Sequence, residues 1–159
     1  MDAVTYPDPR VAALLGRAVV PVKVSFKDQH EQAAALGAVW TPTFQFRTSD
    51  DRLVRMTTGY LAPDGFLAEV AMGEGTVALA ERRFHDAEEA FRRAALETPE
   101  SVQTPEALYW LAVARYRASG KSDGLIETWN DLLNRYRDTT WAMRASFIRA
   151  GQGEKKQAG

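Results

Sequence analysis

The chain has 159 residues and a formal net charge of −1, which allow one domain or two small ones and give no electrostatic footprint for nucleic acid. It contains no cysteine, which excludes disulfides, thiolate metal sites and thiol redox chemistry in the chain as written. No apolar run reaches the roughly 20 residues that span a bilayer, and the first residues lack the basic and apolar regions of a signal peptide, so we expect a cytoplasmic protein that binds no membrane.

Three short elements are expected in the first 40 residues. Asp8 and the proline after it suit a capped helix start, which predicts a helix over 9–15. Valines at alternate positions then predict a strand over 18–26 with one apolar face. Asp28 is expected to cap a second helix, and Gly37 suits the position just after its end.

A β-hairpin and a longer helix are expected next. Strands over 43–47 and 53–58 flank the polar turn 49–52, a pattern typical of antiparallel pairing. A helix is then expected to open at Pro63, since proline suits a first helical turn. Its apolar residues include Phe66, Leu67 and Val70.

Four short motifs in this half occur in a characteristic order. An Asp-Pro turn at 8–9, a Val-Pro-Val-Lys-Val run at 20–24, a Thr-Pro-Thr-Phe step at 41–44 and a Gly-Tyr-Leu-Ala-Pro step at 59–63 follow one another. Together they resemble bacterial thioredoxin-like proteins, in which the proline before the strand is usually cis and helps to hold an extended substrate segment. The resemblance covers residues 1–71 and implies an incomplete thioredoxin-like fold that lacks its first strand and its Cys-x-x-Cys motif.

The resemblance implies a surface that binds a polypeptide. Its candidate binding residues are Trp40, Thr41, Pro42 and Tyr60, with Thr41 and Pro42 supplying backbone contacts and the two aromatic rings flanking them. The residues alone also allow a simpler interpretation. A Thr-Pro step before a strand can be merely a turn, because proline restricts itself and the residue before it, and Trp40 can simply cover the core.

The strand that the resemblance leaves out would lie between the strands expected over 18–26 and 43–47. Its absence would leave unpaired backbone groups on both sides of the gap. The two strands can close up through a right-handed crossover, or a partner chain can insert a strand. A homo-oligomer that forms through the incomplete sheet is the third possibility.

The second half is expected to be helical. Gly73-Glu74-Gly75 interrupts the pattern and predicts a boundary between a domain over 1–72 and a helical region over 76–150. The polar tail 151–159 is expected to be disordered. Helices are expected over 76–82, 85–97, 104–120, 123–136 and 140–149.

Two segments of this region, from Ala78 to Pro99 and from Ala107 to Tyr136, are similar to tetratricopeptide units, whose period is about 34 residues. A plain helical bundle with alanine-rich seams is the alternative. A short tetratricopeptide-like array would present a groove for a peptide. Six arginines can rim such a groove or form a solvated face balanced by glutamates: Arg82, Arg83, Arg92, Arg93, Arg115 and Arg117.

No pattern typical of a catalytic, cofactor or metal site is present in the sequence. His30 and His85 are the only histidines, and neither lies in a zinc-hydrolase motif. The glycines at 73 and 75 lack the lysine of a phosphate-binding loop, and no serine has the setting of a nucleophile elbow. We therefore expect no catalytic residue, no cofactor and no metal ligand.

Two functions remain open. The first is a non-catalytic adaptor or chaperone-like protein that binds a protein or peptide partner through its thioredoxin-like and tetratricopeptide-like parts. The alternative is an N-terminally truncated copy of a thiol–disulfide oxidoreductase whose Cys-x-x-Cys motif lies upstream of Met1.

Overall fold

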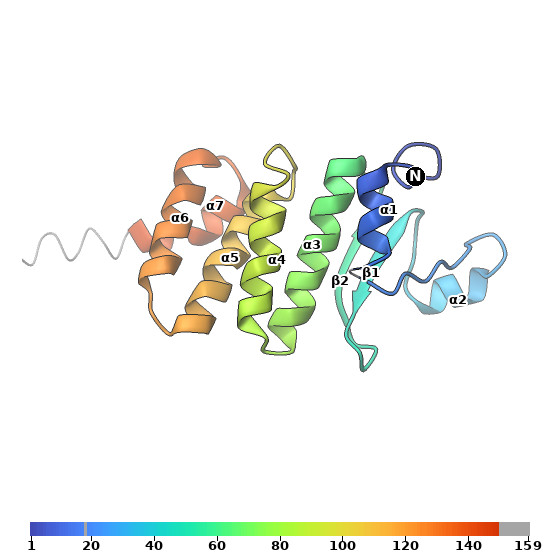
Figure 1. Cartoon of the computed structure of the whole chain (residues 1–159), viewed down its shortest axis with the longest axis horizontal. Helices are drawn as coiled ribbons and strands as arrows, with labels where there is room; N and C mark the ends of the chain where they lie inside the picture. The colour runs from blue at the N-terminus through green and yellow to red at the C-terminus, as the bar shows by residue number, and fades with distance from the viewer. Residues whose placement is uncertain (18, 150–159) are drawn as a thin grey trace, which may run out of the picture.

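A computed structural model describes residues 1–17 and 19–149. The tail 151–159, for which we expected disorder, lies outside these residues. The described chain is mixed α/β but mostly helical, with seven helices and one two-stranded antiparallel sheet (Figure 1). In chain order the elements are α1 (Pro9–Leu15), α2 (His30–Ala35), β1 (Thr43–Arg47), β2 (Leu53–Thr58), α3 (Pro63–Ala80), α4 (Phe84–Leu96), α5 (Thr104–Ser119), α6 (Asp123–Arg135) and α7 (Thr140–Ala145).

The first helix confirms its prediction. Asp8 caps α1, because its Oδ1 accepts a hydrogen bond of 2.8 Å from the backbone N–H of Arg10. Val11 and Leu14 on its inner face are buried. The second helix is capped differently from the prediction: α2 begins after Gln29, and Asp28 instead accepts a hydrogen bond of 2.6 Å from the hydroxyl of Ser25.

The strand expected over 18–26 is wrong. Residues 19–26 form no strand, and the side chains of Val20 and Val22 are 92% and 82% exposed. Residues 19–24 make no backbone hydrogen bond within the described part of the chain. Alternating valines predict a strand only where another strand supplies the ladder, and no described strand lies in pairing contact with them.

The hairpin confirms the predicted strands. Phe46 of β1 pairs with Arg55 of β2, and the pairing is irregular just after Phe46. The turn between the strands includes Asp51, whose φ is 63°. The Thr41–Pro42 peptide bond that precedes β1 is cis.

The helix is not interrupted at residues 73–75, as the pattern there had predicted, since α3 continues through them to Ala80. The two glycines serve close packing. A Cβ at Gly73 would lie 2.1 Å from the ring of Phe46, and one at Gly75 would lie 2.6 Å from the ring of Phe91. A glycine inside a helix costs about 1 kcal/mol relative to alanine, and the packing of two aromatic rings against α3 offsets that cost. The segment expected as a separate helix over 76–82 is the last part of α3.

Helix α3 contributes to both apolar cores. On one side, Phe66 and Val70 pack with Val11 and Leu14 of α1 and with the hairpin. On the other, Met72 and Ala78 join a larger cluster formed with α4–α7. Figure 1 shows α3 between the hairpin and α4, with the remaining helices stacked beyond α4.

The inner faces of the later helices largely match their prediction. Ala87, Ala90, Phe91, Ala94 and Ala95 of α4 are all buried, as are Leu108, Leu111 and Ala112 of α5 and Trp129, Leu132 and Leu133 of α6. Tyr116, near the end of α5, is 43% exposed. The helix expected over 140–149 is interrupted at Ser146, where α7 has its C-cap. Over residues 1–17 and 19–149, no helix combines the length and apolarity needed to cross a membrane.

Candidate functional site

The four residues singled out from the sequence lie at one end of the hairpin. Because β1 and β2 are antiparallel, the segment that enters β1 meets the segment that leaves β2. The backbone N–H of Gly59 donates a hydrogen bond of 2.8 Å to the carbonyl of Pro42 and ties the two segments together. We call Trp40, Thr41, Pro42 and Tyr60 the hairpin-end surface.

The aromatic side chains of the hairpin-end surface are exposed, and its backbone is fixed by a hydrogen bond from Thr43. The side chains of Trp40 and Tyr60 are 69% and 57% exposed. The hydroxyl of Thr43 donates a hydrogen bond of 2.6 Å to the carbonyl of Trp40 and fixes the turn onto β1. Aromatic side chains in exposed positions supply large contact areas at low conformational cost, so this surface is suited to contact with another molecule.

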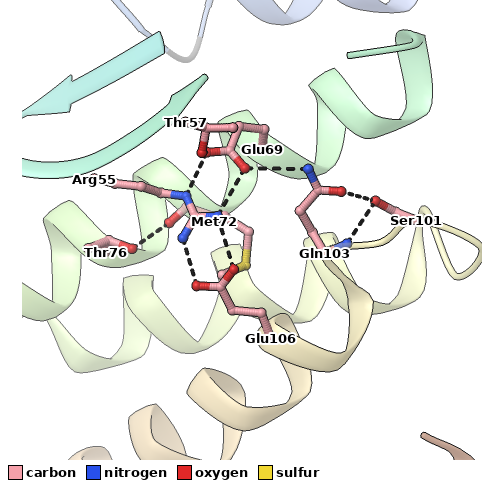
Figure 2. A network of polar contacts seen from close by, with 8 residues as sticks. All are labelled: Arg55, Thr57, Glu69, Met72, Thr76, Ser101, Gln103 and Glu106. Carbon is pink, nitrogen blue, oxygen red and sulfur yellow. Dashed lines mark hydrogen bonds and ion pairs between the residues drawn. The ribbon is translucent and has the colours of Figure 1, made fainter. Parts of the chain in front are cut away.

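A buried ionic cluster joins the hairpin to the helices, and sequence reasoning missed it. Arg55 of β2 donates two hydrogen bonds to Glu69 of α3, at 2.7 and 2.9 Å, and two to Glu106 of α5, at 2.8 and 3.1 Å (Figure 2). The side chain of Glu69 is 1% exposed and that of Arg55 is 13% exposed. The paired fork geometry is the strongest that arginine and carboxylate form.

Neutral side chains complete the cluster. Thr57 donates a hydrogen bond of 2.5 Å to Glu69 Oε1, and the amide of Gln103 approaches Glu69 Oε2 at 3.5 Å (Figure 2). Burial lowers the pKa of Arg55, but the hydrogen bonds and charges of Glu69 and Glu106 outweigh it and hold that pKa above its ordinary value. The guanidinium of Arg55 therefore stays charged. Its positive charge compensates the two adjacent carboxylates, which would otherwise repel each other in a buried site.

The ionic cluster is suited to holding β2 in place against α3 and α5. Arg55 lies between two carboxylates, and its four side-chain hydrogen bonds all go to Glu69 and Glu106. One signal in the sequence was available: Glu69 stands in the apolar run from Phe66 to Val70, where an acid must find a partner. Nothing in the sequence tells which arginine supplies that partner.

Three of the six arginines considered for a groove, Arg83, Arg93 and Arg115, are paired with nearby carboxylates. Arg83 bonds Glu81 and Asp86, and Arg115 bonds Glu88 at 3.3 Å. The guanidinium of Arg117 lies over the ring of Phe84, 4.6 Å from its centre. These contacts favour the solvated helix face balanced by glutamates over an arginine-lined groove.

The two histidines lie far from each other in the sequence and in different environments. The ring of His30 meets the edge of Phe26, with ring centres 5.0 Å apart. His85 lines a shallow pocket of about 330 Å³ near the start of α4. Within the described residues, no group of three or more histidine, aspartate or glutamate side chains is arranged to hold a metal ion.

Comparisons of the chain with known protein families, curated protein sequences and solved structures found no match.

Proposed function

We propose that this chain is a non-catalytic protein that binds polypeptides, acting as an adaptor or in a chaperone-like role. The observation that carries the proposal is the hairpin-end surface: two exposed aromatic side chains, Trp40 and Tyr60, flank the Thr41–Pro42 step on a turn fixed to the strand. The surface offers apolar contact and the main-chain N–H and C=O of Thr41, which make no hydrogen bond within the described residues and which an extended polypeptide can use. The carbonyl of Pro42 is already bonded to Gly59, so Pro42 contributes its ring.

The contacts of the hairpin support a thioredoxin-like origin for the first part. The order of two helices, a hairpin and a helix follows the resemblance stated for residues 1–71, except that the strand expected over 18–26 is not formed. The ring of Phe66 in α3 meets Phe44 of β1 edge to face, with centres 5.4 Å apart, so α3 covers one face of the hairpin. The absence of cysteine makes binding without thiol exchange the natural activity of such a part.

The packing of the later helices supports the tetratricopeptide-like proposal for the second part. Helices α3 and α4, then α5 and α6, are neighbours joined by short connections, and α4 also packs against α5 (Figure 1). Alanines line these contacts, as small residues do where helices approach closely. In the combined proposal, the helical part packs against the hairpin and so holds the hairpin-end surface in a fixed position.

An insulin precipitation assay tests the proposal. Dithiothreitol reduces insulin, and the released chains aggregate and scatter light. We expect this chain to delay the scattering, because it binds exposed chains, and to give no faster reduction than dithiothreitol alone, because it lacks a thiolate. The double variant Trp40→Ala/Tyr60→Ala should lose the delay. Leu53→Ala is the control, because Leu53 is an exposed apolar residue at the opposite end of the hairpin.

Two results would contradict the proposal. A delay that the double variant retains would show that the hairpin-end surface is not the binding site. A reduction faster than with dithiothreitol alone would contradict a purely binding role.

A second candidate function is supported by residues 19–24, which make no backbone hydrogen bond within the described part of the chain. Their exposed valines and these missing bonds fit a thioredoxin-like sheet from which one strand is absent. In this candidate the native polypeptide carries that strand and a Cys-x-x-Cys motif and performs thiol–disulfide exchange. Sequencing the DNA upstream of the codon for Met1 tests it: an in-frame Cys-x-x-Cys segment favours the oxidoreductase, and an in-frame stop codon without it rules the candidate out.

A further inference from the structure

The outer edge of β1 carries main-chain groups without partners. The carbonyl of Pro42 accepts a hydrogen bond from Gly59, so the even-numbered residues of β1 bond toward β2. Thr43 and Gln45 therefore present their N–H and C=O groups to the other side. Within the described part of the chain, no hydrogen bond uses the main-chain groups of these two residues. An open edge of this kind is a template for another strand.

A groove of about 610 Å³ lies beside the later part of this edge, and we call it the edge groove. Besides residues 45–49, its lining includes Val77 and Ala78 of α3 and Ala90 of α4, which form an apolar helical wall. The three arginines of the lining are each paired with carboxylates: Arg47 with Asp51, Arg83 with Glu81 and Asp86, and Arg93 with Glu74. Because these charges are already compensated, the edge groove favours an apolar strand over a charged one.

The same chain contains an apolar segment without a partner. Residues 19–24, Val-Val-Pro-Val-Lys-Val, make no backbone hydrogen bond within the described part of the chain, and we call them the valine segment. The side chains of Val20 and Val22 are 92% and 82% exposed. Val19 and Val20 line the edge groove, so the segment begins close to the open edge without pairing with it. The chain thus holds both an unpaired strand edge and an unpaired segment with the alternation typical of a strand.

Pro21 determines how the valine segment can pair. Since Pro21 has no N–H to donate, its main chain must face away from a partner strand, and the main-chain groups of Val20, Val22 and Val24 then face that strand. If the segment runs parallel to β1, this arrangement puts the three valine side chains on the face of the sheet that α3 covers. An antiparallel direction would turn them to the other face. Parallel pairing therefore brings the valines to the side of the helical wall and leaves Lys23 on the opposite face.

Both ends of the valine segment are held by its own chain. Before it, the N–H of Arg17 donates a hydrogen bond of 3.1 Å to the carbonyl of Leu14 in α1. After it, the N–H of Ser25 donates one of 3.0 Å to the side-chain oxygen of Gln29, just before α2. The connection runs outward from the hairpin to α2, at the opposite end of the molecule from α6 (Figure 1). The segment is therefore open to solvent, where a second copy of the chain can reach it.

We propose that two copies of this chain form a dimer by exchanging valine segments, each of which adds to the outer edge of β1 in the other copy as a parallel strand. The main-chain groups of Thr43 and Gln45 bond the segment, and Val20 and Val22 pack toward the helical wall of the edge groove. One chain supplies both the segment and the edge, so the contact is reciprocal, as a twofold dimer requires, and this selects a second copy as the occupant. The dimer does not depend on the hairpin-end surface.

Sedimentation velocity of the whole chain over a wide range of concentration tests the proposal. We expect a reversible equilibrium between monomer and dimer. Val22→Pro removes an N–H that faces β1 and should raise the dissociation constant of the dimer at least about tenfold. Lys23→Pro is the matched control, because it removes an N–H on the outer side, and it should change that constant by less than about twofold. Neither substitution breaks a backbone hydrogen bond of the single chain.

Amide hydrogen exchange followed by NMR locates the contact. In the dimer, the N–H groups of Thr43, Gln45 and Val22 should be protected, because each then has a partner. Dilution of the parent chain should remove this protection, and so should Val22→Pro for the two residues of β1. The Trp40→Ala/Tyr60→Ala variant should form the dimer as the parent chain does, so failure of the dimer is distinguishable from failure of the hairpin-end surface.

Several results would overturn the proposal. A chain that stays monomeric at every concentration would show that no second copy binds, and protection of Val22 in that monomer would mean that the segment closes on its own β1. A dimer that Val22→Pro leaves intact, or that the two proline variants weaken equally, would place the contact between the copies elsewhere.

Discussion

Glu69 is the residue on which the polar contacts between the hairpin and the helices converge. It accepts hydrogen bonds from Arg55 and Thr57 of β2 and lies near the amide of Gln103, just before α5. A carboxylate in a site this closed is tolerated only while its partners remain, because an isolated buried charge costs several kcal/mol. The ionic cluster therefore makes the placement of β2 depend on one arginine.

Arg55→Met tests that dependence. The substitution keeps an unbranched side chain but leaves Glu69 and Glu106 without their shared cation. We expect the free energy of unfolding to fall by about 3–5 kcal/mol, the usual effect of removing one partner of a buried pair. Urea denaturation followed by circular dichroism measures it. Arg52→Met on the exposed hairpin turn is the matched control and should change stability by less than about 0.5 kcal/mol; a similar small loss for Arg55→Met would show that the cluster is dispensable.

Asp8 gives a pH-dependent prediction at the cap of α1. The side-chain hydrogen bond from Arg10 is the largest cause that lowers the pKa of Asp8 below its ordinary value of 3.8, and the backbone N–H of Arg10 adds to it. A depressed folded-state pKa means that Asp8 stabilises the fold fully above pH 3.8 and loses this contribution as the pH falls through its folded pKa. Asn also caps helices well, so Asp8→Asn removes mainly the charge.

Thermal melting across the acid range measures this effect. Asp8→Asn should melt below the parent chain near neutral pH, and the two curves should converge below pH 3.8. In an Arg10→Gln background the difference should shrink, because the main cause of the pKa shift is gone. A difference that persists at the lowest pH would assign the effect to cap geometry and not to charge.

Helix α3 is the element that determines how closely the layers approach. Its two interior glycines face opposite neighbours, Gly73 toward Phe46 of β1 and Gly75 toward Phe91 of α4. Without a Cβ at either position the rings lie directly on the helix backbone. The lower helical propensity of glycine destabilises α3, and the close contact with the sheet on one side and with α4 on the other offsets this cost.

Gly73→Ala should destabilise the protein even though alanine favours helix. The new Cβ would lie 2.1 Å from the Phe46 ring, and such overpacking typically costs about 1–3 kcal/mol or more. Gly65→Ala in the same helix is the control, since its Cβ would meet only Leu61 at 3.9 Å, and it should be neutral or stabilise by up to about 1 kcal/mol. Urea midpoints compare the two. A stabilising Gly73→Ala would mean that Phe46 moves aside at little cost.

The same glycines show what the sequence could and could not predict. Local signals placed α1, β1 and β2 at their observed bounds, because a cap and a polar turn act within a few residues. The Gly73–Gly75 step looks like a boundary in sequence and is a contact in space, which depends on Phe46 and Phe91 far along the chain. The strand predicted from the valines at 20 and 22 is absent for a related reason. Their alternation is a local signal, but a strand needs a partner strand from elsewhere in the chain.

The candidate site divides in the same way. Trp40, Thr41, Pro42 and Tyr60 were chosen from motifs, and the antiparallel hairpin brings them to one end because its two ends are neighbours by construction. The ionic cluster depends on side chains from β2, α3 and α5, which no spacing rule relates. The resemblance led us to expect unpaired main-chain groups beside the strand over 43–47, but which residues carry them depends on the register of β1 with β2.

As a whole, the molecule is a row of layers in which each element packs against the next. The hairpin and α1 pack on one side of α3, and α4 packs on the other, followed by α5–α7 (Figure 1). The ionic cluster also reaches past α3, because Arg55 of the hairpin bonds Glu106 of α5 directly. A hairpin of two strands is marginal by itself, so these contacts make the stability of the sheet depend on the helical part.

This dependence predicts one cooperative unit. Phe91 of α4 is fully buried in the apolar cluster formed by the later helices, whereas the hairpin packs in the other cluster. Phe91→Ala should lower the free energy of unfolding by about 3–5 kcal/mol, and hydrogen-exchange mass spectrometry should find the same loss of protection in residues 53–58 as in residues 104–119, because both open only when the whole chain unfolds. Phe147→Ala, at an exposed aromatic position, controls for the loss of a ring and should leave both segments protected. If Phe91→Ala deprotects α5 while β2 keeps its parent protection, the two parts unfold separately, and neither α3 nor the Arg55–Glu106 contact couples them.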